Sequence, residues 1–584
     1  MHRRCTYDAA VTDAQDAPTG KPDDAAAGPD TARPDLFGTP PPAAPLPAPL
    51  PAPEPTRDRL LRLLLGRRLL TLGTARWDRT VDWVGTVLVL ALAAFTRLQN
   101  LGRPASLVFD ETYYVKDAFT LGRLGFEAKW PDDPNAAFEA GNVGTYLHEA
   151  AYVVHPQVGK WLISWGIDLG GGAGSSAAWR LANAVVGILA VLLVIRIARR
   201  LFTSTPMGLV AGLLMAVDGT AIVHSRVALL DQFVMFFALA AFGFLLLDRE
   251  QARRRLADRV AAVVDAGGVD AGGVDAGGVV SRFGPGLGFR WWRLAAGVSL
   301  GLATGVKWSG LYFVAGFGLL SVLWDVTARR RAGIRGWLGG AVVRDGLPAF
   351  VAMVPTALIV YVASWWSWFA TPGAYLRQWA AQNPGQGVTW LPDSLRSFVH
   401  YHQQMWNFHT TLTTEHRYAS NPIGWIIQWR PTSFYWTDHQ DGNVQAITSI
   451  GNPLLWWLAA LAIVVLVWFG VRYRDWRALA AISGTIFGWL PWVLTYLDTH
   501  RTVFTFYSIA FTPWVILTLV YVGVVLLERT EHDRDPRARS AVVLGITVVV
   551  TAIVVVSAVF YPLWTAQVVP YDYWHSVIRL RSWV

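Results

Sequence analysis

Long apolar runs restrict the fold of this chain more than any other feature. Hydrophobic residues make up 53% of its 584 residues, and the mean hydropathy is +0.33. The runs are about 20 residues long and alternate with short polar segments, as in helices that cross a bilayer. Pro and Trp cluster near the ends of the runs, where a membrane interface would lie. The sequence therefore predicts an all-α polytopic membrane protein and not a soluble multidomain enzyme.

We predict about eleven spans. They lie near residues 81–98, 177–197, 206–224, 229–247, 290–304, 308–325, 346–368, 451–471, 478–497, 504–527 and 540–562. The fifth and sixth share only about 35 residues, which is short for two crossings of roughly 20 residues each. One tilted span with a re-entrant piece is the alternative interpretation there.

The distribution of arginine predicts the orientation of the spans. Dense segments such as RIARRLF, ARRRAGIRGW, RYRDWR and ERTEHDRDPRAR fall in alternate loops. Because cytoplasmic loops carry an excess of Arg and Lys, this pattern predicts a cytoplasmic N-terminus and an extracytoplasmic C-terminus. The same loops account for the net charge of +9 without a nucleic-acid partner. We expect a multi-pass protein of the cell membrane.

The spans and the segments between them predict the domain organisation. The predicted segments are a disordered cytoplasmic tail (1–56), a basic amphipathic juxtamembrane segment (57–80), an N-terminal membrane domain (81–368) with a first outer loop (99–176), a central outer loop (369–450), and a C-terminal four-span region with an outer tail (451–584). For the basic segment, binding to the inner leaflet and a plain solvated helix are both open. The repeat VDAGGVDAGGVDAGG (264–278) is typical of a flexible linker.

The stretch LVFDETYYVKDA (107–118) follows the first span and contains an acidic pair, Asp110 and Glu111. An acidic pair in a loop is usually only solvated. A carboxylate in a partly apolar setting can instead act as a general base, because burial raises its pKa toward the working pH. Tyr113 and Tyr114 in the same stretch are candidates for contact with a sugar or an acceptor.

Lysine is rare in this chain, and its placement is informative. Only five of the 50 basic residues are lysine, and Lys160 and Lys307 lie at the predicted outer border of the membrane. Lysine is a compact point charge that suits a phosphate group. His155 precedes Lys160 by five residues in YVVHPQVGKWLI, so both are candidates for a phosphate site. A histidine satisfied by backbone near an aromatic belt is the alternative for His155.

Three further charged residues lie at predicted outer borders of spans. Arg180 opens the second span, and Arg226 and Asp231 lie in a short outer turn. Charges near the hydrocarbon are costly, so they need a partner or a function. Arg180 either anchors lipid headgroups or binds phosphate. For Arg226 and Asp231, a structural ion pair and a direct contact with substrate are both open.

Five motifs occur in order along the chain: FDETYYVKDA, HPQVGKWLI, WRLANAVVG, HSRVALLDQFVMFFALAAF and GLATGVKWSGLYF. Together they resemble the protein O-mannosyltransferases, specifically the bacterial, actinobacterial-type branch. The resemblance covers residues from about 80 to 584, and the part from NPIGWIIQWRPTSFYW onward is similar to the family's four-span C-terminal region. It departs from the family at Gln157, where a second Pro often follows the His-Pro, and in a central loop too short for the β-trefoil insert of eukaryotic members.

The resemblance implies a GT-C glycosyltransferase fold with its active site on the non-cytoplasmic face. The donor it implies is a polyprenyl-phosphate mannose, and the acceptor is a Ser or Thr hydroxyl on a polypeptide emerging from the Sec translocon. The family's catalytic acidic pair maps onto Asp110 and Glu111, its His-Pro segment onto His155 and Pro156, and its arginine at the second span onto Arg180.

These residues predict one inverting displacement at the sugar carbon. We expect Asp110 to act as the base, with Glu111 positioning Asp110 or the acceptor. The donor phosphate is expected to meet His155, Lys160, Arg180, Arg226 and Lys307, and the acceptor or sugar to meet Tyr113, Tyr114 and Asp231. No cofactor is expected, although an acidic pair beside a phosphate can hold Mg²⁺ or Mn²⁺.

Two other functions compete with protein mannosylation. One is a GT-C enzyme that uses the same type of donor with a lipid or glycan acceptor. The other is a secondary transporter, which the sequence disfavours because it shows no paired inverted halves and few ionisable residues in the middle of its spans.

Overall fold

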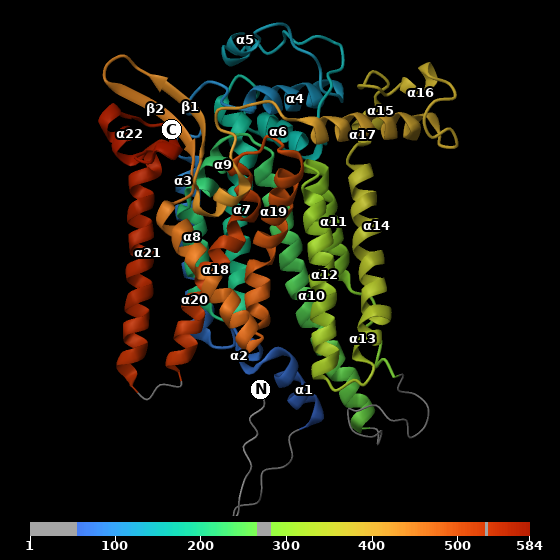
Figure 1. Ribbon diagram of the computed structural model, residues 1–584, viewed down its shortest axis with the longest axis vertical. Helices are drawn as coiled ribbons and strands as arrows, with labels where there is room; N and C mark the ends of the chain where they lie inside the picture. The colour runs from blue at the N-terminus through green and yellow to red at the C-terminus, as the bar shows by residue number, and fades with distance from the viewer. Residues whose placement is uncertain (1–54, 266–281, 532–534) are drawn as a thin grey trace, which may run out of the picture. The chain divides into compact units, whose positions relative to one another are not determined.

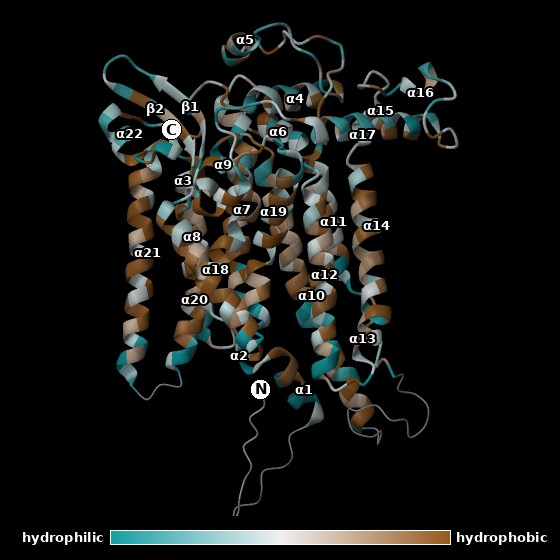
Figure 2. Ribbon diagram, in the orientation of Figure 1, coloured by the Kyte–Doolittle hydropathy of each residue, from teal (hydrophilic) through white to brown (hydrophobic). Residues whose placement is uncertain are grey.

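The computed structural model describes residues 55–265, 282–531 and 535–584. Most of the predicted tail (1–56) and of the repeat (264–278) lies outside these residues. The unit Glu54–Val584 is a bundle of long helices, with an upper end and a lower end as oriented in Figure 1. Figure 2 shows hydrophobic residues along the bundle and hydrophilic residues gathered at its two ends. This is the distribution expected of a membrane-spanning protein.

Nine helices within the described residues are long and apolar enough to cross a membrane, and the pair α8 and α9, bent by 57°, would make ten. The helical segments of the bundle are α3 (Arg76–Leu98), α7 (Ser176–Phe202), α8 (Thr205–Val217), α9 (Gly219–Arg226), α10 (Asp231–Asp265), α11 (Trp291–Val306), α12 (Gly310–Arg331), α13 (Trp337–Gly340), the π-helix η1 (Ala341–Gly346), α14 (Leu347–Ala363), α18 (Pro453–Tyr473), α19 (Trp476–Thr499), the 3₁₀-helix η3 (Thr505–Phe511), α20 (Thr512–Thr530) and α21 (Pro536–Trp564). Each of the eleven predicted spans overlaps one of these helices or helix pairs.

The segment predicted as the fifth span forms only a short helix. α11 has 16 residues and packs against α10 and α14. At 1.5 Å per residue it is about 24 Å long. Arg290 precedes it at the lower end, and Lys307 follows it at the upper end, where α12 begins three residues later. The region 290–325 therefore forms two separate helices, of which α12 is among the nine long apolar helices and the shorter α11 is not.

The segments predicted to lie outside the membrane are folded at the upper end (Figure 1). They contain α4 (Glu111–Leu124), α5 (Asn135–Glu139), α6 (Val158–Leu169), α15 (Trp366–Ala370), α16 (Trp379–Gln382), α17 (Asp393–Thr411), the 3₁₀-helix η2 (Pro422–Ile427), α22 (Tyr571–Val577) and the 3₁₀-helix η4 (Arg581–Trp583). Figure 1 also places the C-terminus at this end, whereas α1 lies at the lower end.

The upper end also contains a small β-sheet, so the prediction of an all-α fold was incomplete. Strands β1 (Thr432–Asp438), β2 (Asn443–Ser449) and β3 (Val568–Pro570) pair antiparallel in the order β1-β2-β3. Buried and more exposed residues alternate along most of β1, as in a sheet with one face on the core. The polar stretch TDHQDGN forms the hairpin turn, where Gly442 has φ of +80°.

At the lower end, the basic segment before the first span forms α1 (Thr56–Leu65) and α2 (Arg67–Thr71). α1 buries Leu60, Leu61 and Leu64 and packs on the lower part of α10. Apolar side chains of α10, including Ala252 and Leu256, belong to the same buried cluster. The apolar face of this amphipathic helix is therefore covered by protein.

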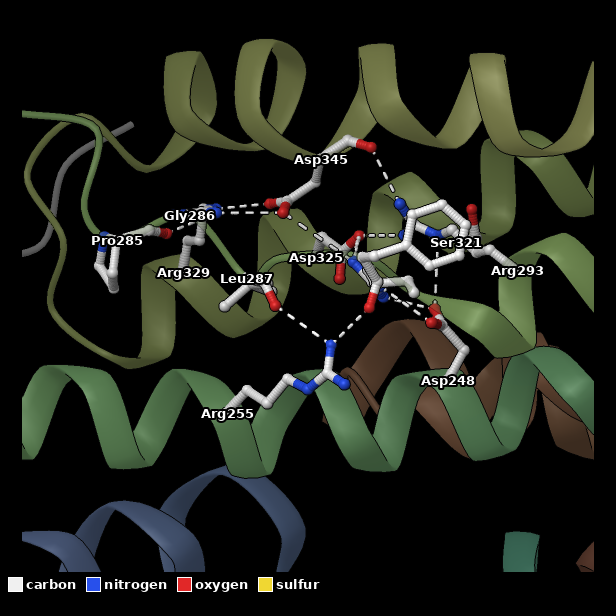
Figure 3. A network of polar contacts seen from close by, with 12 residues as sticks. Asp248, Arg255, Pro285, Gly286, Leu287, Arg293, Ser321, Asp325, Arg329 and Asp345 are labelled. Carbon is white, nitrogen blue, oxygen red and sulfur yellow. Dashed lines mark hydrogen bonds and ion pairs between the residues drawn. The ribbon is translucent and has the colours of Figure 1, made fainter.

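A buried network of charges joins four helices near the lower end (Figure 3). Its six members, three acidic and three basic, are Asp248, Arg290, Arg293, Asp325, Arg329 and Asp345. Arg290 Nε donates to Asp248 Oδ1 at 2.9 Å, and its Nη1 donates to Asp325 Oδ2 at 2.8 Å. Since buried charges are tolerated only when paired, the network fixes α10, α11, α12 and η1 in register.

We expect Asp325→Asn to destabilise the protein, because it leaves Arg290 and Arg293 short of one carboxylate in a buried site. The loss should be about 3–5 kcal/mol in the free energy of unfolding. Unfolding of the purified protein in detergent measures it. Asp258→Asn is the control, since its pair with Arg57 at 2.7 Å is exposed and should change stability by less than about 1 kcal/mol. Equal effects of the two variants would contradict a stabilising role for the network.

Candidate active site

The acidic pair lies where the first outer segment enters α4, across the upper end of the bundle (Figure 1). Asp110 is the N-cap residue of α4, yet its side chain makes no capping hydrogen bond. Aspartate at this position usually accepts from the first backbone N–H groups of the helix. The Asp110 carboxylate is therefore free to take part in other contacts.

Phe109 anchors the backbone on one side of Asp110. Its φ is +49°, in the left-handed region that a bulky residue rarely adopts. Its ring stacks on Phe434 of β1, with centroids 4.7 Å apart, and meets Phe506 edge-on at 5.4 Å. The strained conformation is thus held by aromatic packing against segments more than 300 positions away in the sequence.

Glu111 anchors the other side through Arg180 of α7. Arg180 Nε and Nη2 each donate to the Glu111 carboxylate at 2.8 Å, and both side chains are fully buried. The same carboxylate accepts from the backbone N–H groups of Val108 at 3.0 Å and Ala228 at 2.8 Å. The remaining Arg180 N–H groups donate to the carbonyls of residues 101, 104 and 106. The pair is saturated within the protein, which favours a positioning role for both residues over contact with substrate.

Asp110 itself is half-buried and faces charged residues from other helices. Burial raises its pKa to about 6, and Asp231 acts in the same direction. The Lys307 ammonium and a hydrogen bond from Tyr114 act against this rise. A carboxyl group with a pKa near 6 is ionised at neutral pH and still basic enough to accept a proton, as a general base requires.

Lys307 and Asp231 form an ion pair beside Asp110. Lys307 Nζ lies 2.7 Å from Asp231 Oδ2, and both side chains are largely buried. The ammonium also lies 5.9 Å from the ring centroid of Tyr114 and 5.3 Å from that of Tyr507. The structural pair between Arg226 and Asp231 that the sequence left open is therefore not formed. The sequence did place Lys307 and Asp231 at the same border of the membrane.

His155 lies next to a histidine and an arginine that the sequence did not single out. Its ring stacks on His409 of α17, with centroids 5.3 Å apart, and its buried Nδ1 has no hydrogen-bond partner. His409 Nε2 donates to the Val154 carbonyl at 2.8 Å, so its Nδ1 is the acceptor for Arg501 Nη2 at 3.2 Å. Burial and nearby cations hold the pKa of His155 well below its usual range. Both rings are thus neutral, and His155 keeps a buried nitrogen without a partner.

Arg501 is the cation most available to a ligand here. It follows α19, and its guanidinium contacts the neutral His409 and lies 5.5 Å from the Trp492 ring centroid. No carboxylate within the described residues forms an ion pair with it, and its Nε is buried without an acceptor. It also lines an open cavity of about 750 Å³ with Glu415, His416 and Arg417. Arg501 lies in a short predicted outer loop between two spans, where a charge needs a partner or a function, and this was the signal that could have found it.

Besides Arg180, two further residues expected to bind phosphate form their contacts within the protein instead. Arg226 donates to the carbonyls of Arg97 at 2.9 Å and Gln99 at 2.8 Å, where it caps the end of α3. Lys160 is buried in an ion pair with Glu127, which also accepts from Gln157 at 3.1 Å. The residue that replaces the family's second Pro therefore contributes to this buried network.

Two other residues of α4 bear on the site. Tyr114 is buried beside Lys307, whereas Tyr113 is 64% exposed and points away from the core. Asp117 lies one helical repeat beyond Asp110, and burial raises its pKa to about 7 despite the opposing Lys160 ammonium. Asp110, Tyr114 and Asp117 are separated by four and then three residues, so they lie on one face of α4. Of these three, only Asp110 and Tyr114 were predicted as site residues.

Two protein families match successive parts of the chain. The family described as "Dolichyl-phosphate-mannose-protein mannosyltransferase" matches residues 142–260. The "C-terminal four TMM region of protein-O-mannosyltransferase" matches residues 394–583. Together they cover parts of both halves of the bundle, including His155, Asp231, His409 and Arg501.

Curated relatives named "Polyprenol-phosphate-mannose--protein mannosyltransferase" are similar over most of the chain. One from Mycolicibacterium smegmatis (strain MKD8) is 35% identical over 523 residues, which cover 87% of this chain and 94% of the relative. One from Mycobacterium tuberculosis (strain CDC 1551 / Oshkosh) is 36% identical over 529 residues, covering 87% and 92%. One from Corynebacterium glutamicum is 30% identical over 524 residues, covering 87% and 94%.

The fold is shared with a solved structure, the Saccharomyces cerevisiae protein O-mannosyltransferase Pmt1-Pmt2 complex bound to the sugar donor. The TM-score is 0.64 at 14% sequence identity, and the match covers 88% of this chain and 94% of that chain. This similarity agrees with the expected GT-C fold. Because relatives more than 30% identical are matched over nearly their whole length, the chain belongs to the polyprenol-phosphate-mannose–protein mannosyltransferases, a family of membrane glycosyltransferases.

Proposed function

We propose that this protein transfers a single mannose from polyprenyl-phosphate mannose to a Ser or Thr hydroxyl of secreted or membrane polypeptides. The observation that carries the proposal is the half-buried Asp110 carboxylate, with a pKa near 6, beside the Lys307 ammonium. The names of the relatives support the donor and the protein acceptor. We further propose that acceptors arrive unfolded from the Sec translocon, since a hydroxyl must reach a site partly covered by α17 and the sheet.

The reaction is one displacement with inversion at the anomeric carbon. The acceptor oxygen forms a bond to that carbon, the bond from the carbon to the phosphate oxygen breaks, and Asp110 takes the hydroxyl proton. Polyprenyl phosphate leaves with the bonding electron pair. Lys307 and Arg501 stabilise its charge, and the neutral His155 offers a hydrogen bond through its unpartnered Nδ1. Glu111 and Arg180 hold Asp110 in place and do not touch the substrate.

These cations let the reaction proceed without a metal ion in our proposal. Of the two acidic residues that could have shared a divalent cation, Glu111 already accepts four hydrogen bonds within the protein. Within the residues that the structure describes, no group of three His, Cys, Asp or Glu side chains is arranged as metal ligands.

We propose that the upper end of the bundle is extracytoplasmic and that the protein resides in the cell membrane. The supporting observation is the placement of arginine. Arg199 and Arg200 end α7, Arg329 to Arg331 end α12, and Arg529 lies in the last turn of α20, all at the lower end. Arginine-rich ends face the cytoplasm in membrane proteins, so the active site would face outward.

We expect Asp110→Asn to reduce mannose transfer by a factor of about 10²–10⁴, because the amide cannot accept the hydroxyl proton. The assay uses purified protein, polyprenyl-phosphate mannose labelled in the sugar, and a Ser/Thr-containing peptide. If β-elimination releases the label from the peptide, the product is O-linked mannose. Label in lipid or glycan instead would support the alternative acceptor.

Asp132→Asn is the matched control for this variant. Asp132 is an exposed carboxylate in the same outer segment, and its loss should leave the rate unchanged. Unfolding of both variants in detergent should match that of the unmodified protein. A folded Asp110→Asn protein with substantial residual activity would refute the assignment of the base.

The rate should depend on pH through Asp110. The base acts as a carboxylate, so protonation as the pH falls through about 6 removes it. We expect kcat/KM to be level above that pH and to fall about tenfold per pH unit below it. In sealed right-side-out vesicles, only the external pH should matter. A rate that followed the internal pH would place the site on the other face.

Arg501→Gln should lower kcat/KM by about 10²–10³, as expected when one group that stabilises the developing phosphate charge is removed. Arg417→Gln is the control, because Arg417 lines the same cavity but is exposed. If a divalent cation held the phosphate instead, a chelator would abolish transfer by the unmodified protein and Arg501→Gln would be mild.

A further inference from the structure

A second group of basic residues surrounds a pocket at the lower end of the bundle. The pocket has a volume of about 350 Å³ and lies between the junction of α1 and α2, the lower ends of α7, α19 and α20, and the middle of α10. Arg249 lies 18 residues after Asp231 in α10, which corresponds to about 27 Å along the helix. This is close to the thickness of the hydrocarbon layer, so the pocket and the active site lie at opposite membrane interfaces.

The charge of the pocket is unbalanced. Five arginines and two glutamates line it, and two more carboxylates, Glu531 and Asp475, pair with Arg68 and Arg477, which leaves one net positive charge. The two glutamates already have partners. Glu250 pairs with Arg200 at 3.0 Å, and Glu528 pairs with Arg477 at 2.7 Å and with Arg68 at 2.5 Å.

Arg249 has no such partner. It is only 4% exposed, and its guanidinium stacks on the Trp476 ring with its central carbon 3.3 Å from the centroid. Its Nε is buried without an acceptor, and no hydrogen bond or ion pair joins its guanidinium to any residue in the described part of the chain. Stacking satisfies none of the five N–H donors, and leaving them unpaired in a buried site is costly. An anion bound in the pocket would accept hydrogen bonds from these unpaired N–H donors.

The other walls indicate the kind of anion. Leu65, Leu69, Leu201 and Leu246 line the pocket beside the arginines. Arg67 stands exposed at its mouth, and no hydrogen bond or ion pair within the described residues engages its side chain. A planar guanidinium binds two oxygens of a phosphate at once. A basic group beside an apolar wall at the membrane interface suits a phosphate that carries acyl chains.

We propose that Arg249 binds the phosphate group of an anionic phospholipid at the membrane interface opposite the active site, with Arg67 at the mouth of the pocket. The lipid would join the amphipathic helix α1 and α2 to the middle of α10 and the start of α19. This proposal is independent of the proposed reaction, because none of its residues lies near Asp110.

Native mass spectrometry of the full-length protein in detergent tests this proposal, with phosphatidylglycerol and phosphatidylcholine as probes. The unmodified protein should retain phosphatidylglycerol in preference. Arg249→Gln should weaken its apparent affinity about tenfold, because a charge-assisted hydrogen bond is lost. Arg254→Gln is the control, since Arg254 is exposed on the same helix and does not line the pocket.

Arg67→Gln keeps the test decisive if Arg249→Gln fails to fold. Arg67 is exposed, so its change should leave the fold intact and weaken binding by about twofold. Displacement of the lipid by millimolar inorganic phosphate, with the same dependence on Arg249, would identify a soluble phosphate as the natural ligand of the same site. No preference for phosphatidylglycerol, or equal binding by the Arg249, Arg67 and Arg254 variants, would overturn the proposal.

Discussion

The buried ion pair between Arg180 and Glu111 determines where the candidate active site can form. Arg180 projects from the long helix α7, and through Glu111 it holds the start of α4 against the bundle. Its other donors fix the loop between α3 and α4 through three carbonyl groups. Asp110 is the neighbouring residue, so its position follows from this pair on one side and from the packed Phe109 ring on the other. A saturated ion pair suits this task because every N–H group has a single place to donate.

The membrane explains why the charges of the bundle gather at two levels. α10 carries Asp231 at its upper end and Asp248 at its middle, and α11 is flanked by Lys307 and Arg290. Between these levels the helices are apolar, since an ionised group in the hydrocarbon is costly. The same helices therefore link the active site to the buried network of Figure 3 as stiff connections about 24–27 Å long.

Sequence reasoning predicted the part of the candidate site that local chemistry reveals. Asp110, His155 and Lys307 were identifiable because each is a polar residue near the border of an apolar run. An ionisable group there is costly unless it has a partner or a function. His409 and Arg501 were missed, because they reach the site from segments more than 250 residues after His155. Arg180 was recognised as important, but its role was not, since a sequence shows a charge without showing its partner.

The sequence by itself determined that this is a polytopic membrane protein, which helices form its bundle and which ends of them carry charge. These follow from the bilayer, which demands apolar runs of fixed length and satisfied backbone groups. The tertiary structure alone decided which charges neutralise each other and which stay open to a ligand. Glu111 and Arg180 saturate each other, whereas Asp110 and Arg501 keep free hydrogen-bonding groups. That difference depends on long-range packing, which brings distant side chains within about 3 Å of each other and has no local signature.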